Sequence, residues 1–591
     1  MWRLRKNKMK KLFLMIVLSS VLHCFAQLPF ITKWDLSYAG TGATQIKFGV
    51  GTFGTVSYTW QQLTGGSAIG GGSFSGIIAT ITGLPAGATI RLSINPAHFT
   101  GFNFVYSGLD NNRLVDVEQW GTVAWGSMWG AFFSCSNLYN ITAVDLPNLN
   151  GVTSMKEMFE YCYNLNGPSN INNWNTSTIT NMSRMFNGAS AFNQPIGNWN
   201  TSAVTDMNNM FNNAYAFNQP IDSWNTAAVT NMQLMFYGTQ VFNQSIGSWN
   251  TSAVTDMCGT FASTFVFNQP IDSWNTSSVT DMSYMFSQAH AFNQPIGSWN
   301  TASVINTRYM FSQTNAFNQP IGSWDLSADT SMFRMFFSAT AFNQPLGSWN
   351  TIAVTNMSQM FYWANTFNQF IDNWNTTAVT NMSAMFTGAP AFNQPIGNWN
   401  TSSVISMNSM FSSAYSFNQS LANWNLSSSI DLNYMLMNCG IDCFNYSATL
   451  VGWNANTNTP NGLHLDANTQ YDTSAAAARL NLITTKGWTI SNDIATGTSC
   501  LSTVGYSLIA NQQSTIDIYP NPFTLQTTII FNQEQKNTTI KITDLLGKEI
   551  KTINFTGKQL VIDKAEMKAG VYFLQTIDDK KNITNNKIII Q

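Results

Sequence analysis

Large apolar side chains recur along the middle of the chain with a fixed step of 25 residues. Phe keeps this step from Phe186 to Phe411 and again, within Phe-Asn-Gln triplets, from Phe192 to Phe417. A repeat of this length indicates stacked units, because a unit this small cannot bury its own apolar side chains. The pattern predicts a repeat solenoid over residues 120–425. Trp marks the step most clearly, at positions 174, 199, 224, 249, 274, 299, 324, 349, 374, 399 and 424.

Inside each unit the apolar residues follow helical spacing. Steps of three and four residues are typical of a short amphipathic helix. Thr205 or Asp206 is placed to cap the free amides of its first turn. The apolar residues of one such predicted helix are Met207, Met210, Phe211, Ala214 and Phe217.

The second half of each unit is predicted to be extended. Pro220 ends the helix, because proline cannot donate the next backbone hydrogen bond. Ile221, Trp224 and Val229 then lie in a short stretch that can pair with the same stretch of the next unit. The sequence therefore predicts an α+β repeat solenoid of leucine-rich-repeat type, with one short strand and one short helix per coil.

The Asn after each Trp has two interpretations. It can satisfy backbone groups of the turn as an Asn ladder, or it can line a binding surface, and we favour the ladder. Three departures from the repeat mark places where the array loosens: Asp329 replaces Val, Thr260 replaces Met, and Phe370 replaces Pro.

Different compositions flank the repeats. Gly, Thr and β-branched residues over 27–115 predict an N-terminal β-sandwich, with alternation at Ile46–Val50 and Ile77–Ile81. Residues 426–495 predict a cap for the solenoid, with a helix from Tyr471 to Leu482 and a strand from Gly487 to Ile490. Residues 496–515 are polar and predict a linker. Alternating strands and frequent Lys over 516–591 predict a compact all-β module.

The N-terminus has the features of an export signal. Basic residues precede an apolar run that is too short to span a bilayer, which predicts a signal peptide over 1–26. Cleavage is expected between Ala26 and Gln27. The alternative, a lipoprotein signal that uses Cys24, is disfavoured by His23, since a small residue is usual there. No later segment is apolar enough to predict a transmembrane span.

Charge and chemistry narrow the possible functions. The net charge is −2 and charged residues make up 9%, so no nucleic-acid or anionic-membrane ligand is expected. Residues 174–425 contain three Arg, eight Asp, one His and no Lys or Glu, which is too few convergent groups for an enzyme. We expect no catalytic site, metal or cofactor. Cys439 and Cys443 are the one close cysteine pair, and they could form a local disulfide.

The repeat closely resembles the BspA-like leucine-rich-repeat surface proteins of bacteria. The resemblance covers roughly residues 120–490 and rests on the unit Phe-Asn-Gln-Pro-Ile-Gly-x-Trp-Asn-Thr-Ser-x-Val-Thr-Asp-Met-x-x-Met-Phe. It implies export, surface exposure and, in some members, adhesion to host or matrix proteins. It supplies no ligand for this chain.

The C-terminal module, residues 516–591, resembles the C-terminal sorting domain of the type IX secretion system. The resemblance implies recognition by that machinery at the outer membrane, and release or attachment at the surface of a Gram-negative bacterium. The alternative is a β-sandwich that stays with the protein for binding. The residues that carry the resemblance are Tyr519, Pro520, Asn521, Pro522, Gly547, Gly570, Val571, Tyr572 and Phe573, with the terminal run Lys587–Ile590.

These features predict a secreted or cell-surface protein without enzymatic activity. The first hypothesis is adhesin-like binding of protein ligands through the solenoid face, with the ligand-binding residues unknown. The alternative is carbohydrate binding or a structural role in a surface layer, which the Asn, Gln and aromatic content favours. A third, weaker hypothesis is ice binding by the stacked Thr positions from Thr176 onward.

Overall fold

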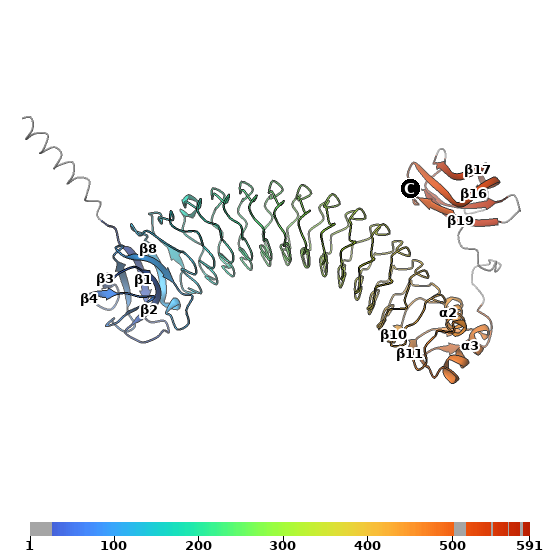
Figure 1. Ribbon diagram of the computed structural model, residues 1–591, viewed down its shortest axis with the longest axis horizontal. Helices are drawn as coiled ribbons and strands as arrows, with labels where there is room; N and C mark the ends of the chain where they lie inside the picture. The colour runs from blue at the N-terminus through green and yellow to red at the C-terminus, as the bar shows by residue number, and fades with distance from the viewer. Residues whose placement is uncertain are drawn as a thin grey trace, which may run out of the picture. The chain divides into compact units, whose positions relative to one another are not determined.

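The computed structural model describes residues 27–500, 516–519, 521–544, 548–564, 567–578 and 583–590. They belong to two compact units that divide after residue 501, each with its own hydrophobic core (Figure 1). The predicted signal peptide, with Ala26, lies outside the described residues, as do residues 501–515 of the predicted linker. Gln27 is the first residue described.

The first unit begins with a β-sandwich. Its larger sheet has the strand order β4-β3-β6-β1-β8-β9 and its smaller sheet the order β5-β2-β7. The sheets pack through aromatic side chains such as Trp34 and Phe48, whose ring centroids are 5.4 Å apart. The elements are β1 (Phe30–Asp35), β2 (Ile46–Thr52), β3 (Val56–Gln62), β4 (Ile69–Phe74), β5 (Ile78–Ile81), β6 (Thr89–Ile94), β7 (Phe99–Asn103), the 3-10 helix η1 (Asn111–Arg113), β8 (Leu114–Gln119) and β9 (Asn140–Ile141).

The sandwich continues directly into the repeats. Strand β8 pairs in parallel with β9, which belongs to the first coil of the array. The amide of Gly126 also donates to the carbonyl of Thr100 over 2.8 Å. The first coil is therefore covered by the sandwich, and the 3-10 helix η2 (Ile171–Asn173) follows just before Trp174.

Backbone hydrogen bonds between neighbouring coils hold the array together. Met207, Asn209, Phe211 and Asn213 donate their amides to carbonyls of the next coil, over 2.7–3.1 Å. Met210 and Asn212, which lie between them, donate instead to the carbonyl three positions back, over 3.1 Å and 3.2 Å. Each coil is thus a series of tight turns joined to the next coil in the manner of a parallel sheet.

Two residues in most coils have left-handed backbone conformation. In one coil they are Asn209, with φ 54°, and Asn213, with φ 56°. A left-handed residue reverses the local chain direction and cannot continue an α-helix. The predicted helix in each coil is therefore wrong: between residues 174 and 424, all of which the structure describes, the coils consist of turns and single-residue bridges. The helical spacing arises because the turns point residues three and four apart into the core.

The predicted strand of each coil and the predicted N-terminal cap of its helix are also wrong. The bridges between coils join Asp206 to Asn231 and their equivalents, not the stretch from Ile221 to Val229. The carboxylate of Asp206 accepts the amide of Asn208 over 3.0 Å, so it closes a turn and does not cap a helix. A predominantly β array with no helix in its coils replaces the expected α+β solenoid.

The Trp series is buried and hydrogen-bonded. Trp224 is 3% exposed, and its indole nitrogen donates to the carbonyl of Ile196 in the preceding coil over 3.0 Å. Its ring stacks on that of Trp199, with centroids 6.3 Å apart and planes 2° apart. From Trp199 to Trp424, each Trp of the series therefore belongs to the core and links two coils.

Two Asn series have different roles. The Asn that follows each Trp acts within its own coil, as Asn200 accepts the amide of Ser202 over 3.1 Å. The Asn of the Phe-Asn-Gln triplet acts between coils: Asn193 accepts the amide of Asn218 over 3.0 Å and the side-chain amide of Gln219 over 2.9 Å. The expected structural role of the Asn after Trp, which satisfies a backbone group of the turn in coil after coil, is thus confirmed, and the triplet Asn forms a second series that joins neighbouring coils.

The predicted departures from the repeat are accommodated in different ways. Thr260 is fully buried, and its hydroxyl lies within hydrogen-bonding distance of the carbonyls of Met232 (3.1 Å) and Met257 (2.9 Å). Phe370, in place of Pro, is 51% exposed at the surface. Asp329 is buried and is described below.

The C-terminal cap combines strands and α-helices. Its three-stranded sheet has the parallel order β10-β11-β13, with helices between successive strands. The helix and strand predicted over residues 471–490 are confirmed as α3 and β13. The elements are β10 (Leu432–Leu436), α2 (Cys443–Ala455), β11 (His464–Ala467), β12 (Gln470–Tyr471), α3 (Thr473–Thr484), β13 (Thr489–Ser491) and β14 (Ile494–Ala495).

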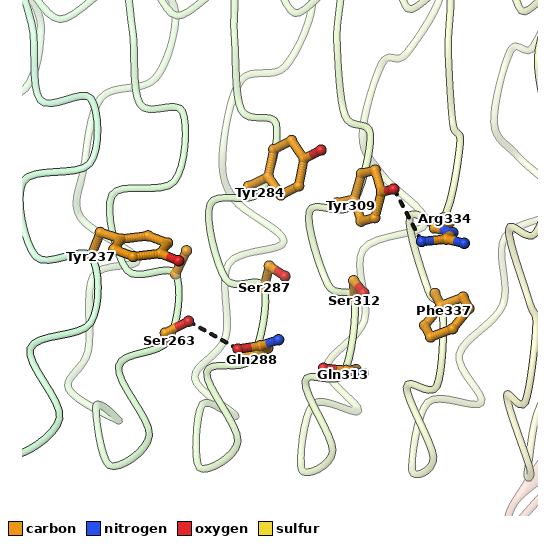
Figure 2. Close-up of a pocket in the computed structure, with 11 residues that line it drawn as sticks. Tyr237, Ser263, Tyr284, Ser287, Gln288, Tyr309, Ser312, Gln313, Arg334 and Phe337 are labelled. Atoms are coloured by element: carbon orange, nitrogen blue, oxygen red, sulfur yellow. Dashed lines mark hydrogen bonds between the residues drawn. The ribbon is translucent and has the colours of Figure 1, made fainter.

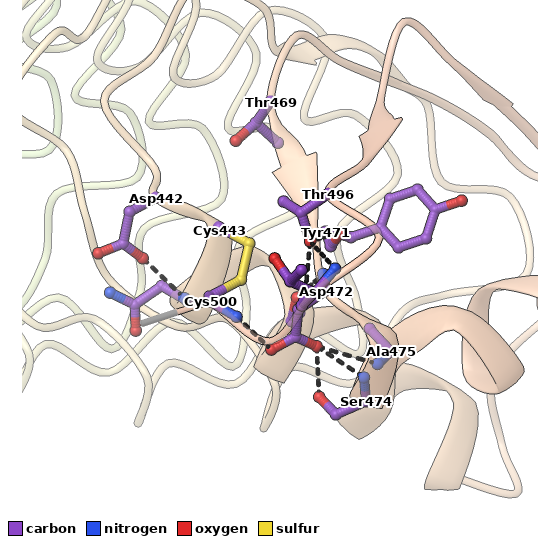
Figure 3. The surroundings of a disulfide bond; sticks show 12 residues. Asp442, Cys443, Thr469, Tyr471, Asp472, Ser474, Ala475, Thr496 and Cys500 are labelled. Atoms are coloured by element: carbon purple, nitrogen blue, oxygen red, sulfur yellow. Dashed lines mark hydrogen bonds between the residues drawn. A yellow bond between two sulfur atoms is a disulfide. The ribbon is translucent and has the colours of Figure 1, made fainter. Parts of the chain in front are cut away.

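A disulfide closes the cap. It joins Cys443 to Cys500, so the local Cys439–Cys443 pair considered from the sequence is wrong (Figure 3). Cys439 is free. The carboxylate of Asp472 accepts the amide of Cys500 over 3.3 Å and the amide of Ser474 over 2.9 Å. The Asp472 side chain thus caps α3 and also holds Cys500, the last residue described in this unit.

The second unit is built from strands around a small apolar core. Its sheet has the order β15-β16-β18-β19, and β17 pairs with β16. The alternating stretches 528–531 and 539–542 both lie in the long strand β16. The strands are β15 (Ile516–Tyr519), β16 (Gln526–Thr543), β17 (Glu549–Asp563), β18 (Gly570–Ile577) and β19 (Ile583–Ile590).

Replacing one core Trp should destabilise the array. Trp299 is 4% exposed and donates its indole N–H to Ile271 over 3.1 Å, so Trp299→Ala should lower the free energy of unfolding by about 3–5 kcal/mol. Trp363→Ala is the matched control, because Trp363 is 53% exposed. Urea unfolding of both variants measures the effect, and equal midpoints would contradict the core assignment.

Candidate functional site

Isolated titratable side chains in the array have ordinary structural partners. His290 stacks on Phe265, with ring centroids 5.2 Å apart, and its Nδ1 lies 2.9 Å from the carbonyl oxygen of Gln313. The carboxylate of Asp372 accepts the amide of Asn398 over 3.0 Å. Within the described part of the chain, no three His, Cys, Asp or Glu side chains gather closely enough to hold a metal ion.

Asp329 is the most perturbed carboxyl group of the coils. It is fully buried, and burial raises its pKa from 3.8 to about 6, although the Thr307 hydroxyl donates to it. Thr307 stands where other coils have Met, and Asp329 stands where they have Val. The two departures are therefore one polar pair between adjacent coils. Since the pair is sealed from solvent, it offers no surface for a substrate.

The Thr positions from Thr176 onward also face inward. Thr201 is 1% exposed, and its hydroxyl donates to the carbonyl of Asn225 over 2.9 Å. These hydroxyls join neighbouring coils, so they cannot form the ice-binding surface considered from the sequence.

The side chains that differ most from coil to coil lie on one face. We call this the variable face and define it by positions 208, 209, 212 and 213 and their equivalents in the other coils. It includes both left-handed positions of each coil. Since the repeated Trp, Phe and Met are buried in the core, this face presents residues that the repeat does not dictate.

A trough runs along the variable face over five coils (Figure 2). The residues along its length are aromatic at both ends, Tyr237 and Phe337, and small in the three coils between, Ala262, Ser287 and Ser312. The enclosed space is about 310 Å³. The trough therefore results from large residues flanking a run of small ones at one position of the repeat.

Aromatic rings and amides form the two sides of the trough (Figure 2). Tyr284 and Tyr309 lie on one side and stack on each other, with centroids 4.4 Å apart. Gln288 and Gln313 lie on the other, and the Gln288 carbonyl accepts the Ser263 hydroxyl over 3.0 Å. The sides combine apolar ring edges with hydrogen-bonding groups.

Two arginines lie among these rings. Arg334 lies over Phe337, 4.8 Å from its centroid, and donates to the Tyr309 hydroxyl over 3.2 Å. Arg308 lies over Tyr284 at 5.5 Å and donates to the Tyr284 hydroxyl over 3.1 Å. The hydrogen bond to the Tyr284 hydroxyl raises the pKa of Arg308 above its ordinary value. Both guanidinium groups are thus held in place by aromatic side chains.

The sequence hypothesis named none of these trough residues, because it assigned binding to the solenoid face and left the ligand-binding residues unknown. Two of the three Arg of residues 174–425 occur in consecutive coils, next to Tyr284 and Tyr309. That clustering of Arg and Tyr was the sequence feature that could have indicated this part of the surface. The two left-handed positions that bring these residues together had no visible signature, since they hold residues as different as Asn, Gly, Leu, Tyr, Arg and Trp.

The structure brings together the two ends of the predicted sorting motif. Asn521 donates its side-chain amide to the carbonyl of Lys587 and accepts the amide of Ile589, both over 2.7 Å. Tyr519 ends β15 and Pro522 follows Asn521. The motif and the terminal run, far apart in sequence, therefore lie side by side.

The other predicted sorting residues lie at the start of β18. Gly570 and Val571 begin this strand, Tyr572 is buried and donates its hydroxyl to the carbonyl of Lys568 over 2.9 Å, and Phe573 is 38% exposed. Pro520 and Gly547 lie outside the described residues.

Comparison with protein families identifies the two parts of the chain. Three overlapping stretches, 126–249, 235–349 and 330–449, match the family described as "Mycoplasma protein of unknown function, DUF285". Together they cover more than half of the chain, which therefore belongs to this family of repeat proteins. Residues 517–591 match the secretion system C-terminal sorting domain.

No curated protein and no solved structure matches the chain significantly. The sorting domain identifies a secreted or cell-surface protein of a Gram-negative bacterium that uses the type IX secretion machinery. None of the helices in the described residues is both long enough and apolar enough to cross a membrane. The predicted localisation is confirmed.

The buried Asp329–Thr307 pair predicts a pH-dependent stability. The folded pKa of about 6 lies above the ordinary 3.8, so the folded state binds the proton more tightly. The contribution of Asp329 to stability should therefore fall as the pH rises from about 4 to 6, by about 3 kcal/mol in total.

The double variant Asp329→Val/Thr307→Met restores the residues of the other coils and should remove this contribution. Urea unfolding of both proteins at pH 4 and pH 7 measures it, and the double variant should gain more stability at pH 7. An equal difference between the proteins at both pH values would contradict the assignment.

Proposed function

We propose that this chain is an adhesin-like surface protein of the BspA-like type that binds protein ligands through the variable face of its coils. The family match and the sorting domain support a repeat protein outside the cell. The single observation that carries the binding role is the trough, whose aromatic and arginine side chains lie half-buried at the surface of an otherwise repetitive array.

The composition of the trough is typical of protein interfaces. Tyr, Trp and Arg are enriched where protein complexes gain most of their binding energy. Here Tyr284, Tyr309 and Arg334 lie together. Trp363, which is exposed, belongs to the coil that follows that of Arg334. The rings are fixed by stacking, so little conformational entropy is lost when a partner binds.

The ring orientations favour a protein over a sugar. A sugar ring binds against a free aromatic face, but Tyr284 and Tyr309 cover one face of each other. Phe337 stacks on Tyr362 at 4.8 Å and also lies under Arg334. The trough therefore presents mainly ring edges, hydroxyls and guanidinium groups. Carbohydrate binding and a structural role in a surface layer remain as outcomes that the test distinguishes.

We further propose that the protein is not an enzyme. Asp329, the coil carboxyl with the most raised pKa, is fully buried, and the arginines beside Tyr284 and Tyr309 donate to tyrosine hydroxyls and to an amide oxygen rather than to a carboxylate. Binding without chemical turnover is the simplest use of a surface of this kind.

Binding arrays test the proposed function. The purified secreted chain is applied to arrays of extracellular matrix proteins and to glycan arrays. We expect retention on a protein, and about a tenfold or greater loss of affinity when Tyr284, Tyr309, Phe337 and Trp363 are all replaced by Ser.

A matched control changes exposed apolar residues that lie off the variable face. Ile305, Ile352 and Ile405 are 53–55% exposed, and their replacement by Ser should leave binding unchanged. Retention on glycans alone, or equal loss in the control, would contradict protein binding by the variable face.

A further inference from the structure

The length of the trough suits a short extended segment. Tyr237 and Phe337 are four coil steps apart, and neighbouring strands are about 4.8 Å apart, so the trough is on the order of 19 Å long. An extended peptide rises about 3.3 Å per residue, so about six residues would fill this length. The aromatic side chains at both ends set this limit.

The sides of the trough offer hydrogen-bonding groups in two neighbouring coils near its middle. The hydroxyls of Tyr284 and Tyr309 lie on one side and the side-chain amides of Gln288 and Gln313 on the other (Figure 2). The two groups on each side are one coil apart and can pair with the backbone of an extended chain, which carries a donor and an acceptor on each residue. A peptide backbone therefore fits these polar groups of the trough.

Arg334 lines the trough and Arg308 lies over the neighbouring Tyr284 and Tyr309, so the tyrosine side of the trough is positively charged. Within the described part of the chain, neither Arg308 nor Arg334 forms a salt bridge. The Asp281 carboxylate attracts Arg308 electrostatically without forming a salt bridge with it. It accepts a hydrogen bond from the side-chain amide of Asn306, over 3.2 Å.

Each guanidinium group also has donors to spare. A guanidinium carries five N–H donors. Arg308 uses one of them, on Tyr284, and Arg334 uses two, on Tyr309 and Gln359. The remaining donors can hold carboxylates, which guanidinium groups bind in a bidentate manner.

We infer that the trough binds an extended acidic peptide segment of another protein, with its carboxylates held by Arg308 and Arg334. The inference rests on the proposed protein-binding function and names the partner's chemistry. The peptide backbone lies along the small residues Ala262, Ser287 and Ser312, and the aromatic ends fix its length. An acidic polysaccharide shares the carboxylates but not the backbone amides.

Labelled peptides test this inference directly. The full secreted chain is titrated into fluorescein-labelled hexaglutamate, hexaglutamine and hexagalacturonate, and binding is followed by fluorescence anisotropy. Hexaglutamate should bind about tenfold or more tightly than the other two. Equal or tighter binding of hexagalacturonate, or no binding of hexaglutamate, overturns the inference.

Two sets of variants locate the binding site. Arg308→Gln/Arg334→Gln should weaken hexaglutamate binding about tenfold or more, whereas Arg184→Gln should leave it unchanged, because Arg184 lies on a distant coil of the same face near Glu160. Ser287→Tyr should block the trough, and Ser412→Tyr, at the equivalent position five coils later, should not. Unchanged unfolding midpoints show that the variants are folded.

The variants also separate this inference from the proposed function. Unchanged hexaglutamate binding by the double Arg variant or by Ser287→Tyr overturns the trough as the peptide site. If the chain is retained on a matrix protein but does not bind hexaglutamate, protein binding by the variable face stands and the acidic peptide is wrong. If it is retained on no protein, the proposed function itself fails.

Discussion

The architecture depends on backbone hydrogen bonds that run from each coil to the next. Alternate residues, such as Met207, Asn209 and Phe211, give their amides to the following coil. The bonds keep their register because left-handed residues at two positions of most coils, such as Asn209 and Asn213, turn the chain at the same places. Buried backbone groups need such partners, so a coil without a neighbour would leave them unpaired. The sandwich and the cap supply the neighbours at the two ends.

The same register separates the residues that hold the array from those that can bind. It points Trp, Phe and Met into a continuous core, where stacked rings and indole hydrogen bonds link the coils. It leaves the left-handed positions and their neighbours at the surface. Because the core is satisfied by the repeated residues, the exposed ones can vary at little cost to stability. The aromatic and arginine side chains around Tyr309 occupy such positions.

Much of this organisation could be predicted from the sequence, but the conformation of the coil could not. The constant step between successive Trp residues indicated stacked units, and the Trp, Phe and Met series indicated the core. Residues three and four apart, such as Met207 and Met210, point inward both from a helix and from successive turns, so their spacing did not distinguish the two. The difference lies in Asn209 and Asn213, whose left-handed conformation is also adopted by Tyr309 and Gln313 and has no single sequence signature. The trough depends on that conformation, so its residues could not be grouped in advance.

The central claim is that the coils are turns joined by hydrogen bonds to their neighbours and contain no helix. Far-ultraviolet circular dichroism of the secreted chain tests it most directly. The coils should add no helical signal to that of α2 and α3, which have 13 and 12 residues, and should contribute the spectrum of turns and bridges. A helical signal large enough for one further helix in every coil would contradict it.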